Sequence, residues 1–86
     1  MQIREEKITL IYDIDGRKAA NFVHNITALK CHIWIRKGDR QVNGKSILGL
    51  LSIAAKQGEE LYITVATDFD DGGTTINKII SFLNME

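Results

Sequence analysis

The sequence predicts an open-faced α+β sandwich, in which a four-stranded antiparallel sheet is covered on one face by three helices. Two observations support this prediction. Apolar residues alternate with polar ones in four short segments, as in half-buried strands, and recur every three or four residues in three others, as in helices. The segments follow one another in the order βαββαβα, and this order favours an antiparallel sheet over a parallel, doubly wound one.

The first strand and the first helix are predicted from the opening 26 residues. Ile8, Leu10 and Tyr12 alternate with more polar neighbours, which predicts a strand with one buried face. From Gly16 onward the apolar positions follow a helical period, and Asp15 is suited to cap the start of that helix. The apolar face of the helix consists of Ala19, Ala20, Phe22, Val23 and Ile26.

A hairpin and a second helix are expected in the middle of the chain. The alternation of Cys31, Ile33 and Ile35 predicts a strand, and residues 37–40 supply a turn before a short strand around Gln41 and Val42. A helix capped by Ser46 and closed near Gly58 is expected next. Its apolar residues, more than one face can hold, are Ile47, Leu48, Leu50, Leu51, Ile53, Ala54 and Ala55.

The last strand and the last helix complete the predicted order. Leu61, Ile63 and Val65 alternate as in a strand, and a turn over 70–73 precedes a helical repeat made by Ile76, Ile79, Ile80 and Leu83. The uncovered face of the sheet is expected to carry the polar and amphipathic members of the strands, which are His32, Trp34, Arg36, Tyr62 and Thr64.

Length, charge and cysteine content restrict the class of protein. The 86 residues fit one domain, 1–86, and eleven basic against eleven acidic residues give no net field toward nucleic acid or a membrane surface. One cysteine, Cys31, cannot form an internal disulfide, and no apolar run is long enough for a signal peptide or a membrane span. We therefore expect a cytoplasmic protein that binds neither nucleic acid nor membranes directly.

Few residues are candidates for metal or acid–base chemistry. His24, Cys31 and His32 do not have the spacing of metal ligands, so neither a metal site nor a cofactor is expected. Five aspartates, at 13, 15, 68, 70 and 71, lie at the ends of predicted elements, where carboxylates commonly cap helices. Arg17 and Lys18 could hold an anion or neutralise Asp13 and Asp15, and the second interpretation is favoured.

The stretch Val42–Ser52 resembles the HPr family, the histidine-containing phosphocarriers of the bacterial phosphotransferase system. The resemblance extends over essentially the whole chain and implies the HPr fold and a non-enzymatic protein. The family motif around the phosphorylated histidine corresponds here to 13–20, with Asp15 in place of the histidine and Arg17 retained. Asp13 and Lys18 replace a glycine and a proline of the motif. Ordinary histidine phosphocarrier activity is therefore not expected.

Ser46 corresponds to the serine that an ATP-dependent HPr kinase/phosphorylase modifies in Gram-positive members of the family. Loss of the histidine with retention of the serine is the pattern of family members that act in catabolite repression. The resemblance therefore implies a regulatory protein. Its expected partners are that kinase and a LacI-type transcriptional regulator of carbon metabolism. The expected contact residues are Arg17, Lys45, Ile47, Leu48 and Leu51.

Two questions remain open from the sequence. The apolar residues Ile47, Leu48 and Leu51 either form an exposed patch beside Ser46 or complete a small core. The alternative functions are a phosphocarrier that uses Asp15 and an HPr-fold binding module in which both phosphorylation sites are inactive.

Overall fold

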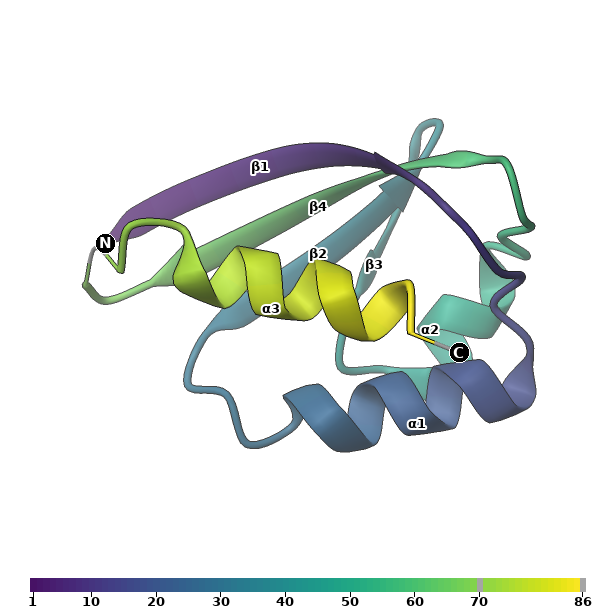
Figure 1. Cartoon of the computed structure of the whole chain (residues 1–86), viewed down its shortest axis with the longest axis horizontal. Helices are drawn as coiled ribbons and strands as arrows, with labels where there is room; N and C mark the ends of the chain where they lie inside the picture. Colours follow the sequence, from purple (N-terminus) through teal and green to yellow (C-terminus); the bar gives the residue numbers. More distant parts are fainter. Residues whose placement is uncertain (70, 86) are drawn as a thin grey trace.

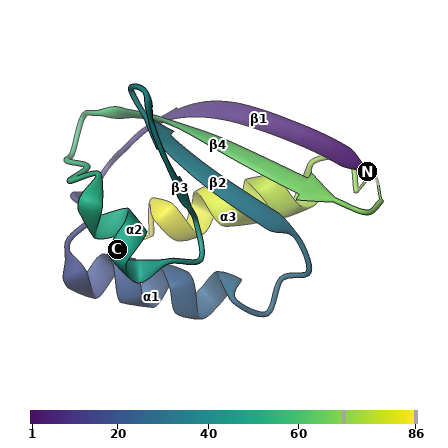
Figure 2. The same ribbon diagram turned by 180° about the vertical axis from the view of Figure 1, so that it is seen from behind.

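The computed structural model describes residues 1–69 and 71–85 and contains the seven predicted elements in the predicted order (Figure 1). They are β1 (Gln2–Thr9), α1 (Gly16–Ile26), β2 (His32–Lys37), β3 (Arg40–Asn43), α2 (Ile47–Ser52), β4 (Glu60–Thr67) and α3 (Thr74–Leu83). The strands form one antiparallel sheet in the order β1-β4-β2-β3. All three helices lie on the same side of this sheet, which confirms the predicted open-faced sandwich (Figures 1 and 2).

The two faces of the sheet differ as predicted. Ile33, Ile35 and Leu61 are almost fully buried beneath the helices. On the opposite face the register places Trp34 beside Thr64 and Arg36 beside Tyr62, and these side chains are partly exposed. The Trp34 ring stacks on His32 at 5.7 Å between centroids, and the Arg36 guanidinium lies 4.2 Å from the centre of the Tyr62 ring. The amphipathic residues on the open face therefore pack against one another in pairs.

The first strand begins and ends earlier than predicted. It spans Gln2–Thr9, and Tyr12 lies beyond it with 37% of its surface exposed. The ladder ends where Thr9 faces Glu60, the first residue of β4, so no strand remains to pair with residues further along. Leu10 is buried as expected, but its backbone bonds to Glu59 and Gly58 in a loop.

The second helix is shorter than predicted. It begins after the Ser46 cap and ends at Ser52, well before Gly58. The left-handed conformation of Ala54, with φ of 48°, turns the chain out of the helix. Ile53 and Ala55 are buried in the core even though they lie outside the helix.

The third helix confirms the sequence pattern, with Ile76 and Ile79 buried. Its start is held by Asp71, whose carboxylate accepts hydrogen bonds from the N–H groups of Gly73 and Thr75 at 2.9 and 3.0 Å. Hydrogen bonding from the Thr75 side chain and from these N–H groups lowers the pKa of Asp71 below its ordinary value. Asp70, which the sequence also placed at this turn, lies outside the described residues.

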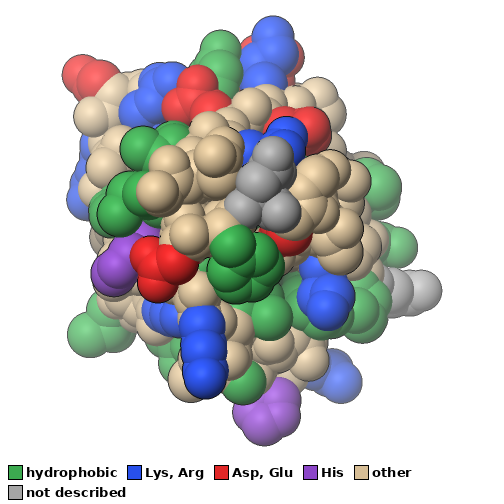
Figure 3. Space-filling view, turned by 90° about the vertical axis from the view of Figure 1, so that its left-hand side faces the viewer, with side chains coloured by type: hydrophobic (Ala, Val, Ile, Leu, Met, Phe, Trp, Pro, Cys, Tyr) green, Lys and Arg blue, Asp and Glu red, His purple; other side chains and the backbone are tan. Residues whose placement is uncertain are grey.

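The surface carries mixed charge. Figure 3 shows the end of the molecule where β1 begins, and basic, acidic and hydrophobic side chains are interspersed across it without a broad region of one sign. None of the helices in the described ranges has the length and hydrophobicity of a transmembrane span.

Candidate functional site

Ser46 lies at the start of α2, and its side chain caps that helix. The Ser46 backbone is extended, with φ of −106° and ψ of 114°, and its Oγ accepts a hydrogen bond from the Gly49 N–H at 3.0 Å. Its carbonyl accepts the first helical bond, from the Leu50 N–H at 3.0 Å. The serine oxygen is therefore fixed at the positive end of the helix dipole, where negative charge is stabilised.

The turn before Ser46 is held by backbone and side-chain bonds. Asn43 Oδ1 accepts from the Lys45 N–H at 2.8 Å, and the Asn43 carbonyl accepts from the Ser46 N–H at 3.0 Å. The Gly44 N–H donates to the Ile33 carbonyl at 2.8 Å, which ties the turn to β2. The position of Ser46 thus depends on close contact between this turn and the sheet.

The ammonium of Lys45, an expected partner contact, is hydrogen-bonded within the protein. Lys45 Nζ donates to the Leu29 carbonyl at 2.7 Å, in the loop after α1, and the side chain is half-buried. In this conformation Lys45 connects the Ser46 turn to the loop between α1 and β2. A contact with a partner would require this bond to break.

The apolar residues of α2 separate into a buried and an exposed set. Leu50 is fully buried, whereas Leu48 has 80% of its surface exposed, and Ile47 and Leu51 are 40% and 39% exposed. The choice that the sequence left open is therefore decided in favour of a surface patch. We call these three exposed residues, Ile47, Leu48 and Leu51, the α2 patch.

Asp15 occupies the start of α1 in the same way that Ser46 occupies the start of α2. Its Oδ1 accepts from the Lys18 N–H at 2.8 Å, and its carbonyl accepts from the Ala19 N–H at 2.9 Å. The neighbouring Asp13 carboxylate accepts from the Gln57 N–H at 2.7 Å, in the loop after α2. A carboxylate therefore already fills the anion-binding position at the start of α1.

Lys18 and Arg17 do not neutralise these carboxylates by direct ion pairing, contrary to the interpretation favoured from the sequence. Among the described residues neither cation forms an ion pair with Asp13 or Asp15. Lys18 Nζ instead donates to the Met85 carbonyl and lies 4.8 Å from the centre of the Tyr12 ring. Burial lowers the pKa of Lys18, and the charge of Asp15 opposes this effect in part.

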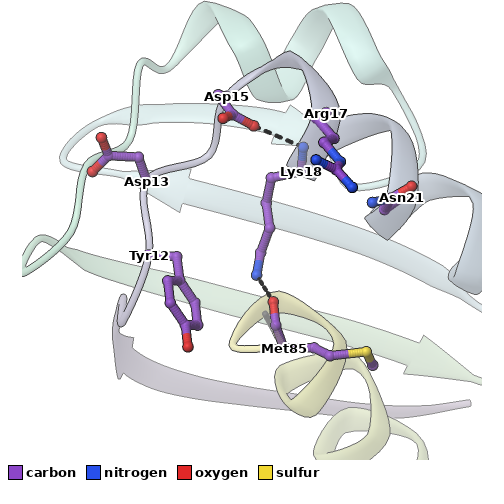
Figure 4. Close-up of a pocket in the computed structure, with 7 residues that line it drawn as sticks. All are labelled: Tyr12, Asp13, Asp15, Arg17, Lys18, Asn21 and Met85. Atoms are coloured by element: carbon purple, nitrogen blue, oxygen red, sulfur yellow. Dashed lines mark hydrogen bonds between the residues drawn. The ribbon is translucent and has the colours of Figure 1, made fainter.

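These groups line a pocket of about 450 Å³ between the start of α1 and the C-terminal segment. Its lining residues are Tyr12, Asp13, Asp15, Arg17, Lys18, Asn21 and Met85 (Figure 4). Figure 4 shows the Lys18 side chain crossing the pocket toward Met85, while the Asp13 carboxylate points away from it. The sequence did not predict the role of Met85, which is separated from Lys18 by 67 positions and shares no local pattern with it.

Removing the Asp15 cap should destabilise the protein. Asp15→Ala loses the acceptor for the Lys18 N–H, and such a loss costs about 1 kcal/mol of unfolding free energy. Asp15→Asn keeps a side-chain oxygen and should be close to neutral. Urea denaturation of the two variants checks this, and equal destabilisation by both would show that the charge of Asp15 matters more than its capping bond.

Comparison with known proteins places this arrangement in a family. A family model described as the PTS HPr component phosphorylation site matches residues 4–84. The HPr-like protein Crh of Halalkalibacterium halodurans is 31% identical over 83 residues, which cover 96% of each chain. The phosphocarrier protein HPr of Neisseria meningitidis serogroup A is 31% identical over 71 residues, which cover 83% of this chain and 78% of the relative.

Solved structures show the same fold. HPr of Bacillus anthracis matches with a TM-score of 0.81 and 25% identity, over 96% of this chain and 99% of that one. Crh of Bacillus subtilis matches with a TM-score of 0.66 and 26% identity, over 96% and 93% of the two chains. The family model covers most of the chain and the fold is shared with these structures, so the chain belongs to the HPr family of the bacterial phosphotransferase system.

Proposed function

We propose that this protein is a regulatory member of the HPr family that is phosphorylated on Ser46 by the ATP-dependent HPr kinase/phosphorylase in the cytoplasm, and that it is not a histidine phosphocarrier. One contrast carries the proposal. Asp15 stands where the family has its phosphorylated histidine, and its carboxylate is committed to capping α1, whereas Ser46 retains a hydroxyl at the start of α2 beside an exposed apolar patch.

The chemistry at Ser46 is a phosphoryl transfer. The Ser46 oxygen forms a bond to the γ-phosphorus of ATP and gives its proton to a base of the kinase, while the bond from that phosphorus to the bridging oxygen breaks and ADP leaves. The phosphate group on Ser46 then carries a charge of about −1.5 to −2 at neutral pH, close to the N–H groups that begin α2. Because the Gly49 N–H already points at Ser46 Oγ, a phosphate oxygen can take over this bond without unwinding the helix.

At Asp15 the same physical argument opposes phosphorylation. An incoming phosphoryl donor would meet two carboxylates, Asp13 and Asp15, at the start of α1, and repulsion between like charges disfavours its approach. Of the two cations that could compensate, Lys18 is held at the Met85 carbonyl on the other side of the pocket, and Arg17, among the described residues, forms no ion pair with either carboxylate.

The α2 patch is proposed to dock the kinase and, after phosphorylation, a LacI-type transcriptional regulator of carbon metabolism. Apolar side chains beside a phosphate provide two kinds of recognition, because a partner can pack on the patch and pair an arginine or lysine with the phosphate. The relative from B. subtilis is described as a catabolite repression protein, which supports a regulatory role. Arg17, exposed on α1, is a further candidate contact, since α1 packs against α2.

Incubation with HPr kinase and ATP, followed by intact-mass spectrometry, tests this proposal. The wild-type protein should gain one phosphate and Ser46→Ala none. Ser52→Ala is the matched control, because Ser52 is an exposed serine of the same helix and should not be the acceptor. A phosphate that persists in Ser46→Ala, or that disappears in Ser52→Ala, would refute Ser46 as the acceptor.

A further inference from the structure

The α2 helix needs support at its C-terminal end. It contains six residues, and an isolated helix of this length is unstable in water because the cost of nucleation is not recovered. At its end the Gly49 carbonyl accepts from the Ser52 hydroxyl and the Leu51 carbonyl from the Ala54 N–H, so the helix continues directly into the turn at Ile53 and Ala54. The chain leaves the helix through Ala54 in a left-handed conformation, which disfavours residues other than glycine. The orientation of the α2 patch therefore depends on what holds this end.

One side chain from the neighbouring hairpin holds it. Lys37, the last residue of β2, places Nζ 3.1 Å from the Ile53 carbonyl and 3.2 Å from the Ala54 carbonyl. The same nitrogen lies 3.1 Å from Glu59 Oε1. The three donor positions of the ammonium thus face three groups, the two carbonyls in the turn that follows α2 and the Glu59 carboxylate before β4. Figure 2 shows the hairpin and α2 beside each other.

Glu59 is itself fixed in position. Its Oε1 accepts from the Lys56 N–H at 2.7 Å, so the carboxylate closes the loop after α2 while it pairs with Lys37. This backbone hydrogen bond, followed by the bond from Lys37, lowers the pKa of Glu59 below its ordinary value. The Glu59 carboxylate therefore stays ionised at neutral pH.

We propose that Lys37 and Glu59 act as positioning residues for recognition at Ser46, because together they fix the C-terminal end of α2 and so preorder the α2 patch. This inference rests on the proposed function for the identity of the partner. Neither residue lies in the patch, and neither needs to contact the partner. A preordered surface binds more tightly because less conformational freedom is lost on binding.

A second ion pair in the molecule provides a matched comparison. Lys7 and Glu60 lie 3.5 Å apart between β1 and β4, with side chains that are 52% and 59% exposed, and within the described part of the chain Lys7 does not bond to a helix. The Lys37 and Glu59 side chains are 30% and 38% exposed and reach the end of α2. Removing the ammonium at either position changes the net charge equally, but only Lys37→Met removes bonds to the turn that follows α2.

The test is amide hydrogen exchange of the unphosphorylated protein, measured by NMR on wild-type, Lys37→Met, Lys37→Arg and Lys7→Met. The Ala54 N–H, which donates to the Leu51 carbonyl, and the Leu50 N–H report on α2, while amides of the β2–β4 ladder report on the rest of the fold. Lys37→Met should make the α2 amides exchange about tenfold faster and leave the ladder amides near their wild-type rates. Lys37→Arg should restore part of the protection, and Lys7→Met should behave like wild-type.

A kinase measurement then links α2 order to recognition. Lys37→Met should raise the KM for phosphorylation of Ser46 severalfold with little change in kcat, because the docking surface and not the reacting hydroxyl is altered. Unchanged exchange in Lys37→Met, equal effects of Lys37→Met and Lys7→Met, or faster exchange with an unchanged KM would each overturn the inference. If wild-type protein is not phosphorylated at all, the proposed function fails. The exchange rates still decide whether Lys37 and Glu59 order α2.

Discussion

Leu48→Ala should raise the KM of the kinase about tenfold while the free energy of unfolding changes by no more than about 0.5 kcal/mol. The Leu48 side chain is 80% exposed, so truncating it removes little of the core. In a complex the same side chain would be desolvated against the partner, and truncation of a residue at the centre of an interface commonly costs more than about 1 kcal/mol of binding free energy. Steady-state kinetics and urea denaturation measure the two quantities separately.

Leu50→Ala is the control for this prediction. Leu50 lies two positions further along the same helix but is fully buried, so its truncation should lower the free energy of unfolding by about 2–5 kcal/mol. At a temperature where Leu50→Ala remains folded, its KM should change less than that of Leu48→Ala. A wild-type KM in Leu48→Ala would show that the α2 patch is not the docking surface.

Gly44→Ala should destabilise the protein by about 3 kcal/mol or more, and this is the largest effect expected from adding a single methyl group. A Cβ at position 44 would lie 2.4 Å from Ile33 Cγ2 and 3.1 Å from Ile33 Cβ, in a buried part of the sheet. Relief of this contact requires the turn to move away from β2, with loss of the hydrogen bond from the Gly44 N–H to the Ile33 carbonyl. Because Ser46 follows this turn, slower phosphorylation is expected as well.

Gly16→Ala is the matched substitution. Nothing lies within 4 Å of a Cβ at Gly16, the first residue of α1, and alanine should stabilise the protein slightly or leave it unchanged. Thermal unfolding of both variants makes the comparison. Similar melting temperatures for Gly44→Ala and Gly16→Ala would contradict the close contact between the turn and Ile33.

Local patterns in the sequence were sufficient to predict the fold. The alternation around Ile33 and Ile63 and the helical repeat around Phe22 and Ile79 each reflect burial on one face, and burial has a fixed period in strands and helices. The element ends were less predictable. The turn after α2 bonds to Lys37, a residue 15 positions before Ser52, and β1 ends where its partner strand β4 begins, so distant segments meet at both ends.

The helix caps of the candidate site could be predicted from local sequence, whereas its long-range hydrogen bonds could not. Ser46 and Asp15 as helix caps follow from local sequence, and the structure shows both capping bonds. The bond from Lys18 to Met85 and the bond from Lys45 to Leu29 join distant segments, so no spacing in the sequence indicates them. Whether the α2 residues were exposed also required the packed structure, since the seven apolar residues among positions 47–55 do not fall on a single helical face.

The most direct test of the regulatory role is to offer the wild-type protein both phosphoryl donors and compare the intact masses. One sample receives HPr kinase and ATP, and the other receives the general phosphotransferase donor enzyme and phosphoenolpyruvate, with a histidine-bearing HPr as the positive control. We predict one phosphate from ATP and none from phosphoenolpyruvate. A phosphate acquired from phosphoenolpyruvate and lost in Asp15→Asn would contradict this account, because it would make Asp15 a working acceptor and the protein a phosphocarrier.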